Sequence, residues 1–287
     1  ASLLVILAGF AVMGYHHVKE NGMLAYSLEF RGGTSTTVDF QKDYSISQIE
    51  SRIVPVVEKA SGDSEVQTQK VKGSTEIVIR TKALDLDQRE ALNQALADEF
   101  QVSDSDITYS SISSTISAEM RQDAVVAVII STVCMLLYIW FRFKDIRFAT
   151  SAVTALIHDV LVVLAFYAVS RITVGSTFIA CMLTIVGYSI NATIVIFDRI
   201  REELKARRKK EPLAELVNRC ITMTLTRSIY TSLTTFIMVF ALFVFGVTSV
   251  REFALPLMVG IVCGAYSSVC ITGALWYVMK TRTGKKK

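Results

Sequence analysis

Residues 124–141 read AVVAVIISTVCMLLYIWF, a run of 18 residues without one charged side chain. About 20 apolar residues are enough to cross the roughly 30 Å hydrocarbon core of a bilayer. Similar apolar runs return at about 148–169, 176–197, 229–247 and 253–279. Together they predict five complete membrane-spanning helices, in a chain of 287 residues of which 52% are hydrophobic.

The N-terminal stretch, ASLLVILAGFAVMG, is apolar but too short to span a bilayer alone. It also lacks the basic start and the small-residue cleavage site of a secretory signal peptide. We therefore interpret residues 1–16 as the second half of a truncated first transmembrane helix, which would bring the bundle to six spans.

Basic residues gather in three places: after the run at 124–141, after the run at 176–197, and at the C-terminus. Loops rich in Lys and Arg stay in the cytoplasm, so both termini are expected inside and residues 17–120 outside. Segment 17–122 carries 11 Lys and Arg against 17 Asp and Glu, whereas the whole chain has a net charge of +4. The basic excess thus indicates membrane topology and not nucleic-acid binding.

Residues 17–120 predict an extracytoplasmic α+β domain. Ser45 followed by Gln48 is the pattern of a helix capping box. Strands are expected at 28–40, 65–73, 75–82 and 105–113, and helices at 45–60 and 85–100. That order is the split βαβ, ferredoxin-like arrangement. The chain then divides into the truncated helix at 1–16, this domain at 17–120, a five-helix transmembrane bundle at 121–280 and a basic cytoplasmic tail at 281–287.

The span at 148–169 contains His158 and Asp159, about ten residues from either end. An ionised Asp at the middle of a span costs about 2.5–3.5 kcal/mol. Asp159 must therefore be protonated, paired or beside water. Two interpretations stay open: a proton site, and a helix–helix hydrogen bond that only stabilises the bundle.

Polar residues follow one side of each of the next two predicted spans. Their spacings of three, four and seven residues predict a polar seam shared by both helices, although hydroxyl groups also join helices without further function. Arg227 lies just before the apolar run at 229–247, so its side chain could instead extend to the cytoplasmic surface. The residues are Thr184, Gly187, Tyr188, Asn191 and Asp198 in the first span, and Thr224, Arg227, Ser228, Thr231 and Thr235 in the second.

The last span carries Gly260 and Gly264, with Ser267 and Ser268 one turn further. Small residues at this spacing let helices approach closely, which predicts packing. The sequence has no nucleophile elbow, no Ser–His–Asp order and no phosphate-binding loop, and its five cysteines show no metal-ligand spacing. We therefore expect neither an enzyme nor a cofactor or metal site.

Several segments resemble the SecF family of Sec protein-translocase subunits, and the resemblance covers essentially the whole chain in order. The signature of the fourth span is TIVGYSINATIVIFDRIREE at 184–203. The other segments are Tyr138-Ile-Trp-Phe-Arg-Phe143, Ala155-Leu-Ile-His-Asp-Val160, Thr224-Leu-Thr-Arg-Ser228, Thr231-Ser-Leu-Thr-Thr235, Phe253-Ala-Leu-Pro-Leu257, Gly264-Ala-Tyr-Ser-Ser268 and, more loosely, Glu29-Phe-Arg-Gly-Gly-Thr34.

The resemblance implies a six-span bundle of the resistance–nodulation–division (RND) type in the bacterial cytoplasmic membrane. It implies pairing with SecD, as a separate chain or fused to it, beside the SecYEG channel, with YajC and YidC as further candidate partners. The proton motive force would then promote export of unfolded secretory polypeptides, which the outer domain would hold. Whether H⁺ or Na⁺ is coupled stays open.

Two departures from the family pattern stand out. Asn191-Ala192 replaces the family's Asn-Asp in the fourth span, and residues 113–117 replace a Gly-Pro stretch before the second. The family's fifth-span Arg maps onto Arg227. The candidate ion-pathway residues are Asp159, His158, Asn191, Arg227 and Asp198. An RND-type small-molecule exporter and a scaffold subunit for SecD remain the alternatives.

Overall fold

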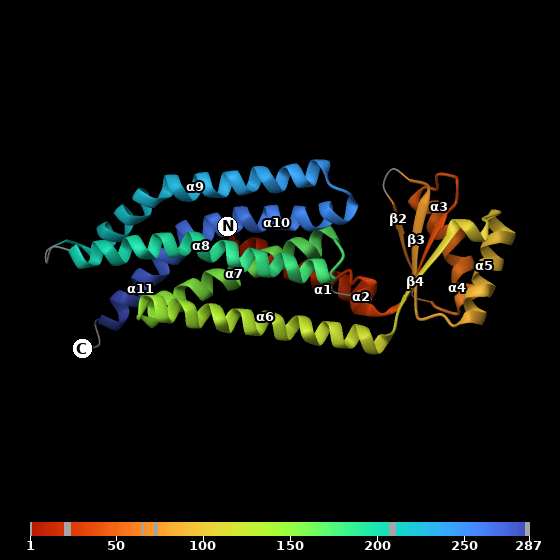
Figure 1. Ribbon diagram of the computed structural model, residues 1–287, viewed down its shortest axis with the longest axis horizontal. Helices are drawn as coiled ribbons and strands as arrows, with labels where there is room; N and C mark the ends of the chain where they lie inside the picture. Colours follow the sequence, from red (N-terminus) through yellow and green to blue (C-terminus); the bar gives the residue numbers. More distant parts are fainter. Residues whose placement is uncertain (1, 20–23, 65, 72–73, 207–210, 285–287) are drawn as a thin grey trace. The chain divides into compact units, whose positions relative to one another are not determined.

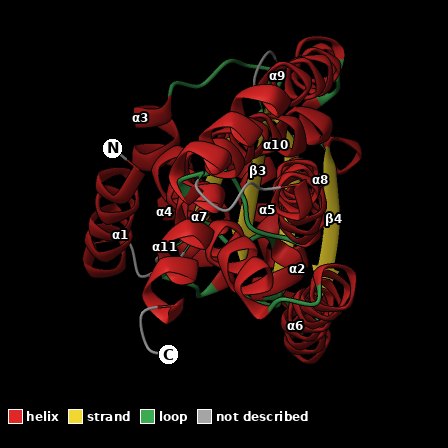
Figure 2. Ribbon diagram, turned by 90° about the vertical axis from the view of Figure 1, so that its left-hand side faces the viewer, coloured by secondary structure: helices red, strands yellow, loops and turns green. Residues whose placement is uncertain are grey.

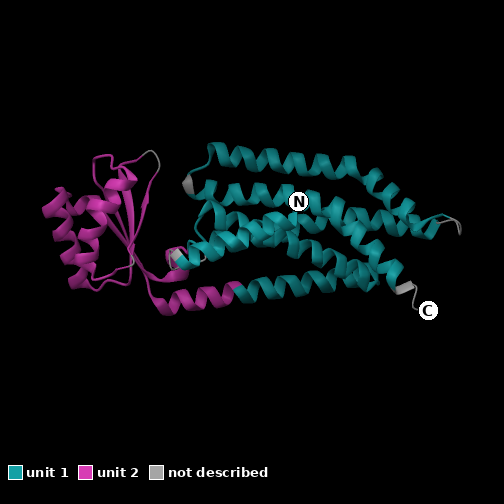
Figure 3. Cartoon of the chain, turned by 180° about the vertical axis from the view of Figure 1, so that it is seen from behind, with its two compact units in different colours: residues 1–25, 125–287 teal, residues 26–124 magenta. Residues whose placement is uncertain are grey.

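The computed structural model describes residues 2–19, 24–64, 66–71, 74–206 and 211–284. Gly73, at a predicted turn, and the basic residues 207–210 and 285–287 lie outside the described residues. The chain forms two compact units, which Figure 3 colours separately. Residues 1–25 with 125–287 make the helical unit, and residues 26–124 make the sheet unit.

The helical unit confirms the five predicted apolar helices (Figure 1): within the described residues, five helices are long and apolar enough to cross a membrane. The fifth runs from α10 through a π-helical turn into α11. A shorter apolar helix, α1, precedes them. The bounds are α1 (Ser2–Lys19), α6 (Ser114–Phe143), α7 (Ile146–Ser170), α8 (Ser176–Ala206), α9 (Leu213–Phe245), α10 (Thr248–Ser267), η3 (Ser268–Thr272) and α11 (Gly273–Gly284).

Helix α7 packs against α1, α8 and α10 (Figure 2). The apolar windows of α7, α8 and α10–α11 are buried over 39–44% of their residues, against 6% for α6 and 11% for α9. At one end, the rings of Phe148 and Trp276 stack at 4.9 Å and Phe197 packs on Phe148. The three-helix core α7–α8–α10 is therefore where a polar side chain is removed from solvent and lipid alike.

Two glycines allow α10 to approach α8 closely. A Cβ on Gly260 would lie 2.4 Å from the side chain of Ile185, and one on Gly264 would lie 3.2 Å from Cβ of Ser189. The packing predicted for these glycines is confirmed. The same contact brings Ser189 against the face of α10.

The sheet unit confirms the predicted order of strands and helices. Its four strands form an antiparallel sheet in the order β2-β3-β1-β4. Alternate residues such as Val38 and Ile79 are buried against helices, where Leu92 and Leu96 are also buried. The bounds are α2 (Leu28–Arg31), β1 (Gly33–Asp39), α3 (Ile46–Gln48), η1 (Ile49–Ile53), α4 (Val54–Ser61), β2 (Gln67–Lys70), β3 (Glu76–Thr81), α5 (Leu86–Phe100), η2 (Asp104–Asp106) and β4 (Ile107–Ile112).

The capping box at Ser45 and Gln48 is confirmed. The prediction that the first strand begins at residue 28 is wrong, because Leu28–Arg31 form one helical turn and the strand starts at Gly33. Gly32 and Gly33 have φ angles of +75° and +114°, and a Cβ on Gly33 would lie 2.2 Å from the carbonyl oxygen of Thr81. The glycine pair is thus the junction between helix and strand and not a break within a strand.

Candidate functional site

Asp159 has no exposed surface and lies in the three-helix core. Its Oδ2 accepts hydrogen bonds from Oγ of Ser189 at 2.6 Å and from Oγ of Ser267 at 2.7 Å. Its Oδ1 accepts from Sγ of Cys263 at 3.2 Å and lies 3.0 Å from Nδ1 of His158. We call these five residues the Asp159 cluster. They come from α7, α8 and α10 and satisfy both carboxyl oxygens inside the protein.

The net charge of the Asp159 cluster depends on whether the Asp159 carboxyl and the His158 imidazole each carry a proton. His158 is the one ion-pair partner of Asp159 within the described residues, and it is cationic only when protonated. Its side chain is 12% exposed, while that of Asp159 is 0% exposed. An ionised carboxylate buried without a cation is costly, so a proton held on either group changes the energy of the whole cluster.

A second layer of hydroxyl groups continues from the Asp159 cluster along α8 and α10. Oγ of Ser268 lies 3.1 Å from Oγ1 of Thr193 and donates to the carbonyl oxygen of Ser189 at 3.3 Å. Oγ1 of Thr272 donates to the carbonyl oxygen of Ser267 at 3.0 Å. These bonds lie where α10 passes into the π-helical turn. Such π-helical turns are frequent at functional sites.

Asn191 and Arg227 lie elsewhere, at a cavity of about 70 Å³ between α8 and α9. We call it the α8–α9 cavity. Arg227 is the fifteenth of the 33 residues of α9, well inside a helix that starts earlier than its apolar run. Both Asn191 and Arg227 are exposed on this chain. The lining residues are Tyr188, Asn191, Ala192 and Val195 of α8 and Arg227, Ser228, Thr231 and Ser232 of α9.

Part of the predicted seam meets at the α8–α9 cavity, where Tyr188 and Asn191 of α8 lie with polar residues of α9. Ser189, which the predicted seam does not include, donates to Asp159 instead. Asp198 belongs to neither, because its carboxylate pairs with Arg142 of α6 at 2.9 Å. The five candidate residues therefore fall into three places.

Sequence reasoning missed Ser189, Cys263 and Ser267. The sequence places Ser267 beside a packing motif, and Cys263 is one of five cysteines without metal-ligand spacing. Their polar atoms inside a span were the available signal, but only the rotation of each helix decides which of them meet Asp159.

One subset of the Asp159 cluster has metal-ligand geometry. The donor atoms of His158, Asp159 and Cys263 all lie within 4.8 Å of one another, and these residue types can bind a zinc-like cation. However, Oδ2 is already saturated by two hydroxyl donors, and Oδ1 accepts from the thiol. Nε2 of His158 is buried without a hydrogen-bond partner in the described structure. The expectation of no metal stays a prediction.

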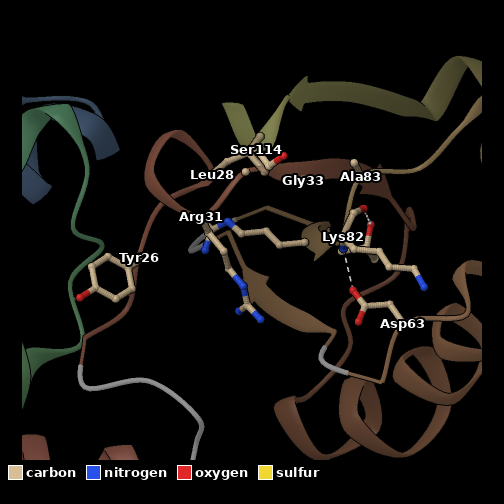
Figure 4. Close-up of a pocket in the computed structure, with 11 residues that line it drawn as sticks. Tyr26, Leu28, Arg31, Gly33, Asp63, Lys82, Ala83 and Ser114 are labelled. Atoms are coloured by element: carbon tan, nitrogen blue, oxygen red, sulfur yellow. Dashed lines mark hydrogen bonds between the residues drawn. The ribbon is translucent and has the colours of Figure 1, made fainter. Parts of the chain in front are cut away.

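The sheet unit has its own cavity, of about 250 Å³ (Figure 4). Arg31, Arg80 and Lys82 line it, so it is bordered by basic side chains. Oδ2 of Asp63 accepts from the backbone N–H of Lys82 at 2.6 Å, and Nζ of Lys82 donates to the carbonyl oxygen of Gly62 at 2.7 Å. These bonds hold the loop after β3 against the end of α4.

Comparisons with known proteins agree on one family. The family model described as "Protein export membrane protein SecD/SecF, C-terminal" matches residues 91–282. The chain is 34% identical over 253 residues to protein translocase subunit SecF of Sebaldella termitidis, covering 88% of this chain and 81% of that protein. It is 36% identical over 256 residues to SecF of Vibrio alginolyticus, covering 88% and 79%.

A solved structure gives the same result. The crystal structure of SecDF from Thermus thermophilus, described as a translocon-associated membrane protein, superposes with a TM-score of 0.82 at 34% identity. The match covers 98% of this chain and 37% of that one, so this chain spans just over a third of the SecDF chain. The chain belongs to the SecD/SecF family of protein export membrane proteins.

Proposed function

We propose that the protein is an accessory subunit of the Sec protein-export machinery. It acts with SecD, uses the proton motive force and promotes translocation of unfolded secretory polypeptides across the bacterial cytoplasmic membrane. One observation carries this proposal: the match to SecF proteins extends over most of this chain and most of theirs. It is a transport subunit and not an enzyme.

The proposed architecture is a six-span RND-type bundle with α1 as its first span. Both termini are cytoplasmic, and residues 17–120 form a ferredoxin-like domain outside. The strand order β2-β3-β1-β4 supports that class of domain. The polar, exposed side chains of Asn191 and Arg227 support a partner surface on α8 and α9, which SecD would cover. SecYEG, and with it YajC and YidC, would lie beside the pair.

Asp159 is the proposed proton-binding group. If its carboxylate takes up the proton on Oδ2, that oxygen becomes a donor, so Ser189 or Ser267 must turn its own hydroxyl away. Proton uptake therefore rearranges bonds that join α7 to α8 and α10. A proton that crosses 100 mV supplies about 2.3 kcal/mol, enough to bias a two-state movement.

The outer domain would hold the emerging chain in this cycle. Its cavity beside Arg31, Arg80 and Lys82 is a candidate contact for an extended polypeptide. The outer domain would release and rebind the emerging chain as Asp159 gains and loses its proton.

Asp159→Asn tests the proposal. Asn keeps the size of the side chain but cannot titrate, so the part of export that an imposed proton gradient drives in membrane vesicles should be lost at normal protein levels. Asp123→Asn is the matched control, because Asp123 is exposed on α6 and is not among the candidate ion-pathway residues, so this variant should retain export. Gradient-driven export that persists in Asp159→Asn would contradict the role given to Asp159.

One observation favours a scaffold for SecD as the second candidate. Ala192 lines the α8–α9 cavity beside Arg227 and offers no carboxylate there. A scaffold predicts that Ala192→Asp leaves proton coupling unaltered, whereas a working seam predicts that it changes coupling.

A further inference from the structure

The cavity of about 250 Å³ in the sheet unit gathers positive charge in an acidic part of the chain. Three cationic side chains line it, from α2, from β3 and from the loop after β3, and they are Arg31, Arg80 and Lys82 (Figure 4). Segment 17–122 as a whole carries 11 Lys and Arg against 17 Asp and Glu. This cavity, which we call the basic cavity, therefore attracts a negatively charged group that the surrounding domain would repel.

Hydrogen bonds to neutral groups hold two of these cations in place. Nη2 of Arg80 donates to Oε1 of Gln69 at 2.9 Å, and Nζ of Lys82 donates to the carbonyl oxygen of Gly62 at 2.7 Å. A guanidinium carries five N–H donors and an ammonium three, so each of these bonds uses one donor and cancels no charge. Asp63 is the one acidic residue among the lining residues, all of which the structure describes, and its Oδ2 accepts from the backbone N–H of Lys82. The charged groups of the lining therefore leave an excess of positive charge.

The start of α6 adds backbone donors to the basic cavity. Ser114, the first of the 30 residues of α6, is one of the lining residues. The first N–H groups of an α-helix have no partner within the helix and form the positive end of its dipole. A Cβ on Gly32 would lie 3.2 Å from Cα of Ser114, so this glycine lets the end of α2, with Arg31, approach the start of α6 closely. Guanidinium groups and a helix N-terminus favour the same ligands, which are carboxylates and phosphates.

The position of the basic cavity along α6 favours a polypeptide over a lipid headgroup. Ser114 and Ala124, where the uncharged run begins, belong to one continuous helix. At 1.5 Å per residue, Ser114 lies about 15 Å beyond the start of that run. The headgroup layer extends only about 5–8 Å beyond the hydrocarbon core of a bilayer. A lipid phosphate would therefore stop short of the cavity, whereas a polypeptide outside the membrane can reach it.

We infer that the basic cavity binds side-chain carboxylates in acidic segments of the exported polypeptide. The inference rests on the proposed function for the source of that polypeptide. Arg31 and Arg80 would each take a carboxylate through two parallel N–H donors, and Lys82 would add a point charge. The lining residues Tyr26 to Gly33 and Ser114 belong to the two segments through which the sheet unit continues into the rest of the chain. A bound acidic segment would therefore link these two connections.

The test measures binding of fluorescent peptides to the purified full chain in detergent. One peptide alternates Ser with Asp and Glu, and its partner carries Asn and Gln at the same positions. The acidic peptide should bind at least about tenfold more tightly, because hydrogen bonds to charged groups are the stronger ones, and added salt should weaken its binding. Arg31→Gln and Arg80→Gln should each weaken the acidic peptide about tenfold and leave the amide peptide unaffected. Arg80→Lys, which keeps the charge, should recover part of the binding.

Arg52→Gln is the matched control, since Arg52 is exposed on η1 of the same unit and does not line the basic cavity, so this variant should bind the acidic peptide as the parent does. Equal binding of the two peptides by the parent, or undiminished binding by Arg31→Gln and Arg80→Gln, would overturn the inference. Displacement of the acidic peptide by soluble short-chain phosphatidylglycerol would overturn it too, because the cavity would then be a lipid site. Binding is measured without a proton gradient, so its failure is separate from a failure of the export assay with Asp159→Asn.

Discussion

The hydroxyl group of Ser267 on α10 donates a hydrogen bond of 2.7 Å to Oδ2 of Asp159 on α7. Ser189 on α8 donates to the same oxygen at 2.6 Å. Three helices are therefore joined at one carboxyl oxygen that has no exposed surface. A hydrogen bond in such a place contributes to stability and responds to protonation at the same time.

Ser267→Ala should lower the free energy of unfolding by about 1–3 kcal/mol, because Oδ2 of Asp159 loses a donor where water cannot replace it. Ser189→Ala should do the same, and the double variant should depart from additivity since both hydroxyls serve one oxygen. Thermal unfolding in detergent measures these changes. Ser170→Ala is the control: Ser170 is exposed and donates only to the carbonyl of Phe166, so less than about 0.5 kcal/mol should be lost. Purely additive losses would argue against a shared acceptor.

Gly260→Ala should destabilise the helical unit, because the new methyl group would lie 2.4 Å from Ile185. Combining it with Ile185→Ala should recover part of the loss by making room. Gly187→Ala serves as the comparison, since a Cβ there meets nothing within 4 Å and alanine favours a helix. The measurement is the unfolding temperature of the parent, of Gly260→Ala, of its combination with Ile185→Ala and of Gly187→Ala. A Gly260→Ala protein as stable as the parent would refute the close helix contact.

Gly33→Ala should destabilise the sheet unit by more than about 2 kcal/mol. Its φ of +114° is strained for any residue with a Cβ, and that atom would lie 2.2 Å from the carbonyl oxygen of Thr81. Gly62→Ala also occupies a positive φ, of +62°, but its Cβ would meet only Nζ of Lys82 at 3.8 Å, so about 1 kcal/mol is expected. Proteolysis of the sheet unit in the full chain measures the difference, and equal sensitivity of the two variants would contradict it.

Asp39 should make the sheet unit sensitive to acid. The hydroxyl of Thr75 and then the N–H of Gln41 donate to its carboxylate and lower its pKa below the ordinary value of 3.8. Because the folded-state pKa is the lower one, this stabilisation is present above pH 3.8 and is lost as the pH falls through the folded-state pKa. Thr75→Val should therefore be less stable than the parent near neutral pH, and the two unfolding curves should converge in acid. A constant gap at every pH would exclude the carboxylate as its cause.

Asp198→Asn should change the free energy of unfolding by less than about 1 kcal/mol, because its ion pair with Arg142 is partly exposed, with 34% and 42% of the two side chains accessible. Arg142→Gln should have a similar small effect, and the double variant should add little more. A double-mutant cycle by thermal unfolding measures the coupling. A coupling well above 1 kcal/mol would mean that the pair is buried by a partner.

Local features of the sequence were sufficient for much of the fold. Absence of charge over 18 residues identifies a span because a charged side chain inside the bilayer is costly. The capping box of Ser45 and Gln48 is equally local, since its bonds join residues three positions apart. The helical turn at Leu28–Arg31 escaped prediction, because the β-like residues after it and the glycine pair suggested one continuous strand.

The candidate site was only partly accessible to sequence reasoning. His158 and Asp159 stand out because an acid in the middle of a span is expensive wherever it points. Ser189 and Ser267 do not stand out, since hydroxyl groups are common in membrane helices and usually bond to their own backbone, as Thr231 does.

The sequence by itself determined which segments are apolar helices, which segment is an α+β domain and which carboxyl group lies within a span. Only the tertiary structure decided that Ser189 and Ser267, 30 and 108 residues away from Asp159, bond to it, and that Asn191 and Arg227 border a separate cavity. The physical reason is that the rotation of each helix is set by contacts between helices, such as Gly260 against Ile185. Spacing along one helix shows which residues share a face, but packing alone decides what that face meets.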